Sequence, residues 1–168
     1  MRTVAWDTDK NELQMIDQRL LPGTFAVVSY RSHVEVARAI ADMVVRGAPA
    51  IGASAAFGLA LAGFESQART TPELLSDLQT AAALLKASRP TAVNLAWAVE
   101  RILGTISRRE RAGGEGETVD GLRRLVLAEA QKLADEDVEI NKRMAAHGAE
   151  LLADGDTIVH HCNTGALA

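Results

Sequence analysis

The longest uncharged run in the chain extends from Gly47 to Phe64, and it restricts the fold more than any other segment. Its length approaches that of a membrane-spanning helix. It consists mostly of alanine and glycine, however, and contains Pro49 and Ser54, which favours a central helix of a globular core over a membrane span. Small residues such as Gly52 and Gly58 let neighbouring backbones approach closely. We therefore expect a buried central helix and no membrane partner.

The acidic balance of the chain limits its partners. A formal net charge of −4 at pH 7 argues against nucleic-acid binding, and it means that an anionic substrate must be held by local cations. Nearly half of the 168 residues are apolar, as in a soluble globular protein. The single cysteine excludes an intramolecular disulfide, and Met1–Glu12 contains no apolar signal segment. Together these features predict a cytoplasmic protein.

The N-terminal part of the chain shows strand patterns followed by helix patterns. A polar turn at Asp7–Asn11 separates the first two of three short segments that predict a small antiparallel sheet: Thr3–Trp6, Leu13–Ile16 and Phe25–Tyr30. Ser32 and Glu35 have the spacing of a capping box, and the apolar stripe after them predicts a helix that ends at Gly47. Later helices are predicted from Thr71 to the residue before Arg89, from Pro90, and from Val119 to Leu152.

The only cysteine follows a predicted strand. Thr157–His161 is rich in β-branched residues, and Asn163–Gly165 favours a turn after it, so Cys162 is expected at the carboxyl end of the strand. Ligands bind at that edge in open α/β sheets, which makes Cys162 a candidate reactive thiol. Two alternatives remain: a buried structural cysteine, and a metal site that uses His160 with Cys162 but lacks further ligands.

Two arginines precede predicted helix starts. The helix after Arg46 is expected to begin at Pro49 with Ala48 as its N-cap, and alanine has no side-chain oxygen to accept the first N–H groups. Arg89 precedes Pro90 in the same way. A guanidinium beside uncapped N–H groups suits a phosphate or another oxyanion, although a surface arginine at a tight connection is the alternative.

Three segments together resemble the N-terminal half of the methylthioribose-1-phosphate isomerase family, which is related to regulatory subunits of a guanine-nucleotide exchange factor for translation initiation. They are Arg46–Gly52, Arg89–Leu95 and His161–Ala168. The resemblance implies an α/β protein: a mostly helical N-terminal domain with a small antiparallel sheet (1–118), a long connecting helix (119–154) and the first strand of an otherwise missing Rossmann-like catalytic domain (155–168).

The resemblance also implies roles and partners. Arg46, Gly47, Ala48 and Arg89 match residues that bind a sugar-phosphate substrate, and Cys162 matches the catalytic cysteine. The family forms homodimers, needs no cofactor or metal, and isomerises 5-methylthioribose 1-phosphate to 5-methylthioribulose 1-phosphate in methionine salvage. Its acid/base aspartate and the rest of the C-terminal half lie beyond Ala168 in such proteins, so residues 1–168 alone are expected to be inactive.

Two other functions stay open from the sequence. A ribose 1,5-bisphosphate isomerase shares the scaffold but accepts a second phosphate. A non-catalytic relative that senses sugar phosphates or nucleotides is the other alternative, and Cys162 with the two arginines argues against it.

Overall fold

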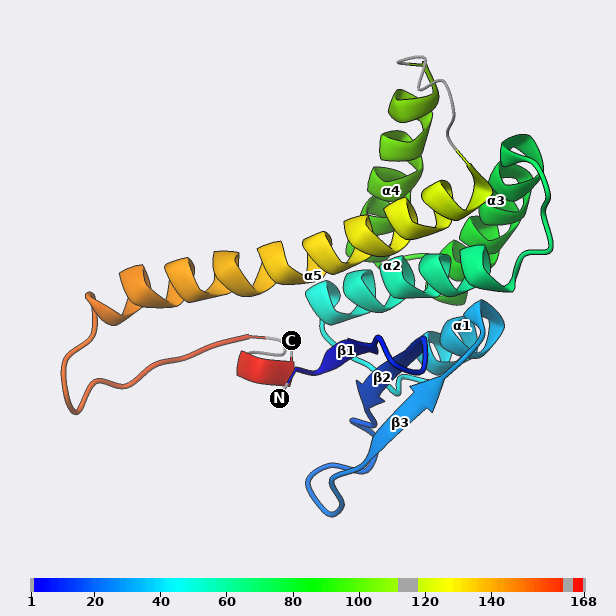
Figure 1. Cartoon of the computed structure of the whole chain (residues 1–168). Coiled ribbons are helices and arrows are strands. Elements are labelled where there is room, and N and C mark those ends of the chain that lie inside the picture. The colour runs from blue at the N-terminus through cyan, green and yellow to red at the C-terminus, as the bar shows by residue number, and fades with distance from the viewer. Residues whose placement is uncertain (1, 112–117, 162–164, 168) are drawn as a thin grey trace.

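Figure 1 shows the computed structural model of the chain, which describes residues 2–111, 118–161 and 165–167. Its elements are β1 (Val4–Asp7), β2 (Glu12–Ile16), β3 (Val27–Tyr30), α1 (His33–Ala41), α2 (Ala48–Glu65), α3 (Thr71–Ser88), α4 (Val93–Arg111), α5 (Val119–Ala149) and the short 3-10 helix η1 (Gly165–Leu167). The expectation of a mostly helical chain with a small antiparallel sheet is confirmed.

The sheet has the order β1-β2-β3, with both pairs antiparallel. The predicted turn between β1 and β2 is closed by Asp7, whose Oδ1 accepts hydrogen bonds from the backbone N–H groups of Asp9 and Lys10, both at 3.1 Å. This register pairs Trp6 with Leu13. Leu13 is fully buried and Trp6 packs against the core, so one face of the sheet covers the helices.

Helix α1 begins as predicted but ends earlier. Ser32 caps it, and Ser32 and Glu35 form both hydrogen bonds of a capping box. The helix stops at Ala41 instead of Gly47, because Met43 adopts a left-handed backbone with φ 60°. The Val44 N–H then donates to Ala39 O at 2.9 Å, which closes the helix end in the manner usually made by glycine. Since Met43 carries a side chain, the sequence did not signal this end.

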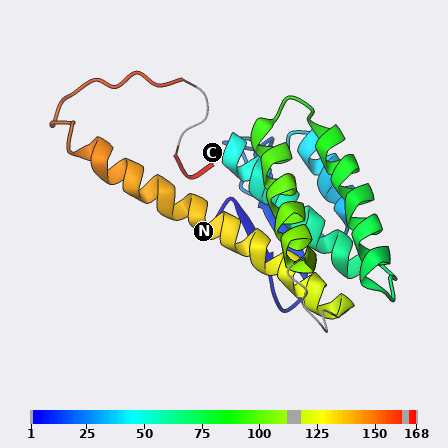
Figure 2. The ribbon, with the colours of Figure 1, turned by 90° about the horizontal axis from the view of Figure 1, so that it is seen from above.

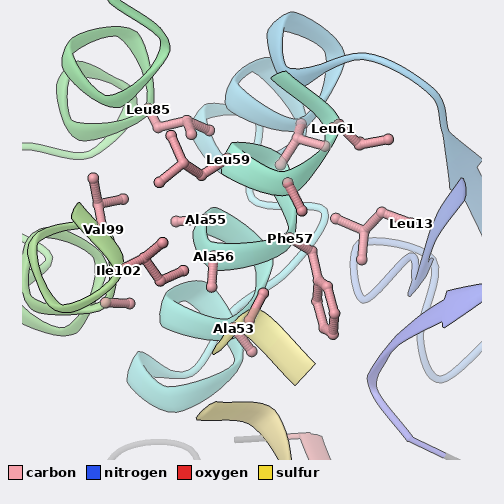
Figure 3. Close-up of a cluster of buried hydrophobic side chains, with 14 of the residues drawn as sticks. Leu13, Ala53, Ala55, Ala56, Phe57, Leu59, Leu61, Leu85, Val99 and Ile102 are labelled. Atoms are coloured by element: carbon pink, nitrogen blue, oxygen red, sulfur yellow. The ribbon is translucent and has the colours of Figure 1, made fainter. Parts of the chain in front are cut away.

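Helix α2 is the predicted central helix. It contacts all four other α-helices and strands β1 and β2, and Figure 1 shows it between the sheet and α5. Figure 3 shows its side chains directed to both sides, with Leu59 near Leu85 and Phe57 near Leu13. α2 is long and apolar enough to cross a membrane, yet 78% of it is buried inside the protein. It is the core helix of a globular fold.

Glycine lets α2 and α4 approach closely at their N-terminal ends. A Cβ atom added at Gly52 would lie 3.0 Å from the backbone oxygen of Asn94. Backbone cannot move aside as the end of a flexible side chain can, so any side chain at this position forces the two helices apart.

Replacing Gly52 by alanine is therefore expected to destabilise the fold, because overpacking costs about 1 to 3 kcal/mol and outweighs the gain in helix propensity. Gly63 on the same helix is the matched control: its added Cβ would meet only side-chain carbons of Arg123 and Leu78 at 3.8 Å, so Gly63→Ala should be neutral or stabilising. Urea unfolding of both variants tests this. Equal stabilities would contradict the close-approach argument.

Helix α5 is continuous over 31 residues, as the sequence predicted, and spans about 46 Å. Its first half contributes Leu122, Val126 and Leu133 to the core. Its second half projects past the other elements, as both Figure 1 and Figure 2 show, and leaves Ile140 and Met144 more than half exposed.

The predicted strand Thr157–His161 is not formed. Residues 156–161 are irregular, and Val159 is 93% exposed. A strand needs a neighbour to accept and donate its backbone hydrogen bonds, and within the described residues this segment has none. The segment predicted to begin a Rossmann-like domain is therefore irregular in this structure instead of a strand. Figure 1 shows instead that this part of the chain turns back, which brings η1 near the beginning of β1.

Candidate functional site

Arg46 lies in the connection between α1 and α2, and its guanidinium uses only part of its hydrogen-bonding capacity within the described residues. Its Nη2 donates to the backbone oxygen of Gln18 at 2.8 Å. Its Nε is buried and, among the residues that the structure describes, has no acceptor. A buried guanidinium N–H without an acceptor is costly unless another group supplies one. Arg46 is therefore suited to donate to an oxyanion at this position.

Gly47 and Ala48 form the start of α2, one residue earlier than predicted. Gly47, not Ala48, is the N-cap, and its φ of 96° is a conformation that favours glycine. Ala48 is the first helical residue, and Pro49 therefore takes the second helical position. The conclusion drawn from the sequence holds despite this shift: no side chain caps the helix. The first-turn N–H groups beside Arg46 are available to an anion.

Arg89 also differs from its expected setting. It is the C-cap of α3, and Pro90 belongs to a turn in which the Ala92 N–H donates to Arg89 O at 3.0 Å. Helix α4 begins only at Val93, so it is not started by proline. The Arg89 side chain is partly exposed, and within the described part of the chain no hydrogen bond or ion pair to its guanidinium is formed. It is a cation open to a ligand.

The contact between Gly52 and Asn94 places the first turns of α2 and α4 together. Arg46 and Arg89 thus precede two adjacent helix starts, and a shared anion site between them stays a prediction. A cavity of about 150 Å³ lies between these helix starts and the middle of α5, lined by Pro49, Gly52, Asn94, Trp97, Arg101, Leu133, Glu136, Asp137 and Ile140. Among the predicted site residues that the structure describes, none lines it, although Pro49 and Asn94 belong to the same two segments.

Sequence reasoning missed the polar groups that α5 brings to this cavity. Burial raises the pKa of Asp137 above its ordinary value. Arg101 lies 5.5 Å from the centre of the Trp97 ring and pairs with Glu136 at 2.6 Å. Trp97 is half exposed, so one side of its ring faces away from the core. The spacing of Trp97 and Arg101 at i and i+4 is the one sequence signal that could have found this pair.

The predicted catalytic residue, Cys162, lies outside the described residues, and its distance from Arg46 and Arg89 stays a prediction. The segment that follows it is described. Leu167 O accepts a hydrogen bond at 3.2 Å from the side chain of Gln18, which also donates to Arg46 O at 3.1 Å. The backbone beyond the cysteine therefore lies beside the Arg46 connection.

The chain is similar to known proteins over nearly its whole length. The chain is 48% identical over 168 residues to a protein of Pyrococcus horikoshii named putative methylthioribose-1-phosphate isomerase. It is similar to the crystal structure of 5-methylthioribose 1-phosphate isomerase from P. horikoshii, with a TM-score of 0.87 and 47% identity over 99% of this chain. It is also similar to the crystal structure of translation initiation factor eIF-2B, subunit delta, from A. fulgidus, with a TM-score of 0.84 and 43% identity, again over 99% of this chain.

The chain spans less than half the length of these proteins. It covers 44% of both P. horikoshii matches and 46% of the A. fulgidus structure. A family-wide sequence pattern matches residues 44–168, which include the Arg46, Arg89 and Cys162 segments. The match takes in most of the chain. This chain belongs to the Initiation factor 2 subunit family.

Proposed function

We propose that the chain is the N-terminal part of an isomerase that converts 5-methylthioribose 1-phosphate to 5-methylthioribulose 1-phosphate in methionine salvage. The observation that carries the proposal is the start of α2, where among the described residues the buried Arg46 Nε has no acceptor and no side chain caps the helix. The proteins named as this isomerase share 47 to 48% identity with the chain across nearly all of it, which supports the same substrate class.

The substrate's chemistry fits these groups. A phosphate on C1 blocks simple opening of the sugar ring to an aldehyde, so the enzyme must hold a dianion while the ring opens and hydrogen moves between C2 and C1. We assign the phosphate and sugar oxygens to Arg46, to the N–H groups of Gly47 and Ala48, and to Arg89, because charge-assisted hydrogen bonds are the strong ones. We assign the acid/base chemistry to Cys162, with an aspartate from a C-terminal segment as its partner.

The proposal includes a division of the protein into parts. Residues 1–118 form the helical domain with the sheet, 119–154 the connecting helix, and 155–168 the start of a Rossmann-like catalytic domain. Exposed Ile140 and Met144 on the projecting half of α5 support a further segment packing there. We further propose that the full-length protein is a homodimer in the cytoplasm; for the second point, the burial of α2 within the core agrees with a globular protein outside a membrane.

The decisive experiment is a progress curve with 5-methylthioribose 1-phosphate. It uses the full-length protein, by which we mean this chain followed by the C-terminal segment that its relatives carry. We expect formation of 5-methylthioribulose 1-phosphate by the full-length protein and none by residues 1–168 alone. Turnover by residues 1–168 would contradict the division of the catalytic groups, and no turnover by the full-length protein would contradict the assigned reaction.

One observation favours a second function. The similar A. fulgidus structure is named as a subunit of a translation initiation factor, so a non-catalytic regulatory role is the alternative. A regulatory protein would bind the sugar phosphate without converting it. Calorimetric binding and the progress curve, measured on the same sample, distinguish the two.

A further inference from the structure

We infer that Gln18 is a positioning residue of the active site, one that holds the Arg46 connection and the backbone beyond Cys162 at a fixed separation. Its side-chain Nε2 donates to Arg46 O at 3.1 Å and to Leu167 O at 3.2 Å. These acceptors belong to the two segments to which the proposed function assigns phosphate binding and acid/base chemistry. The inference rests on that proposed function.

The backbone of Gln18 strengthens the connection to Arg46. Its N–H donates to Val44 O at 2.9 Å, and its carbonyl accepts from Arg46 Nη2 at 2.8 Å. Three hydrogen bonds thus join Gln18 to residues 44–46, and they hold both the main chain and the guanidinium of Arg46. The guanidinium keeps its Nε for another acceptor, so Gln18 orients Arg46 without occupying this donor.

Burial makes these hydrogen bonds selective for glutamine. Gln18 is only 1% exposed, so water cannot replace a lost donor. Both Nε2 bonds require N–H groups, which a glutamate of the same shape does not have. The neighbouring pair helps to hold the segment, because Arg19 donates to Asp17 Oδ1 at 2.9 Å and to Oδ2 at 2.7 Å. Gln18 is therefore a rigid, buried bridge.

The side-chain nitrogen of Gln18 has no N–H group left for the substrate, since both N–H groups of Nε2 already have acceptors. Its effect on the reaction passes through Arg46 and the Leu167 segment. A small displacement of a binding group can lower the rate strongly even when every catalytic group is still present.

The test replaces Gln18 by methionine, which keeps the volume, and separately by glutamate, which keeps the shape, in the full-length protein. Both variants should lower kcat/KM roughly ten- to a hundredfold. KM and the inhibition constant of inorganic phosphate should rise in parallel, because the displaced group is Arg46. A merely structural role would reduce the folded fraction, which lowers the apparent kcat and leaves KM unchanged.

Gln14→Met is the matched control. Gln14 lies in β2, four residues before Gln18, and its side chain donates to Asp7 Oδ2 at 3.1 Å instead of to either segment. It should leave KM and kcat at the wild-type values. Wild-type kinetics in Gln18→Met, or recovery of activity in Gln18→Glu, would overturn the inference.

Hydrogen–deuterium exchange separates this inference from the proposed function, because it requires no turnover. Gln18→Met should speed amide exchange in residues 45–48 and 165–167 together, whereas Gln14→Met should change neither segment. If the wild-type protein lacks isomerase activity, the assigned reaction fails, and the exchange data still decide whether Gln18 joins the two segments. Faster exchange in only one segment, or in neither, would overturn the bridge.

Discussion

Replacing Cys162 by serine in the full-length protein is expected to lower kcat about 10²- to 10⁴-fold, the usual contribution of a positioned acid/base group. A thiol has an ordinary pKa near 8.5, so it can exchange a proton at neutral pH, whereas a serine hydroxyl cannot. Serine has nearly the same size, and the phosphate-binding groups are unchanged. Steady-state kinetics with 5-methylthioribose 1-phosphate measure the loss, and calorimetry should show that the substrate still binds.

Arg89→Ala is the comparison for this variant. Its guanidinium is assigned to binding, so its removal should raise KM and weaken the binding of inorganic phosphate. A Cys162→Ser protein with wild-type kcat would show that the cysteine takes no part in the reaction. In that case the structural reading of a lone cysteine would be the correct one.

Phe57→Ala should destabilise the fold by about 3 to 5 kcal/mol, the range for removing a large aromatic side chain from a core. Phe57 is 1% exposed at the middle of α2 and stacks on Trp6 with ring centres 5.8 Å apart. The cavity left by the ring cannot collapse easily, because α2 is surrounded by the sheet and the other helices. Urea unfolding gives the difference in the free energy of unfolding.

Phe64→Ala is the matched control, since Phe64 lies on the same helix and its ring centre is 6.1 Å from that of Trp6. It is 37% exposed, so we expect a loss of about 1 kcal/mol. The two variants share the contact to Trp6 and differ in burial. Similar losses in both would mean that the aromatic contact, and not the filling of the core around α2, determines the stability of this region.

The sequence predicts local structure well where a residue type has one physical role. The small, uncharged residues of α2 predicted burial in a core, and the spacing of Ser32 and Glu35 predicted a capped helix start; both predictions are confirmed. Prediction fails where the conformation depends on distant groups. Met43 ends α1 in a left-handed conformation because the chain must turn so that Val44 and Val45 become buried, and a methionine gives no sign of this.

The candidate site shows the same division. Arg46 and Arg89 were proposed as site residues from their positions ahead of helix starts, but the predicted helix starts were wrong by one residue for α2 and by more for α4. Gln18 was not found at all. Its contact with Leu167 joins residues 149 positions apart, and no local pattern announces a hydrogen bond over that separation. Thr157–His161 has strand composition, yet composition supplies no pairing partner.

The unbroken course of α5 has a consequence for how this protein tolerates changes in length. Inserting one residue into its projecting half would turn everything after it by about 100° and advance it by about 1.5 Å. The backbone segment that returns from this helix to Gln18 would then be displaced relative to the Arg46 connection. The helix therefore fixes both the distance and the rotation of the segment that follows it. We expect substitutions on its surface to be tolerated better than insertions or deletions within it.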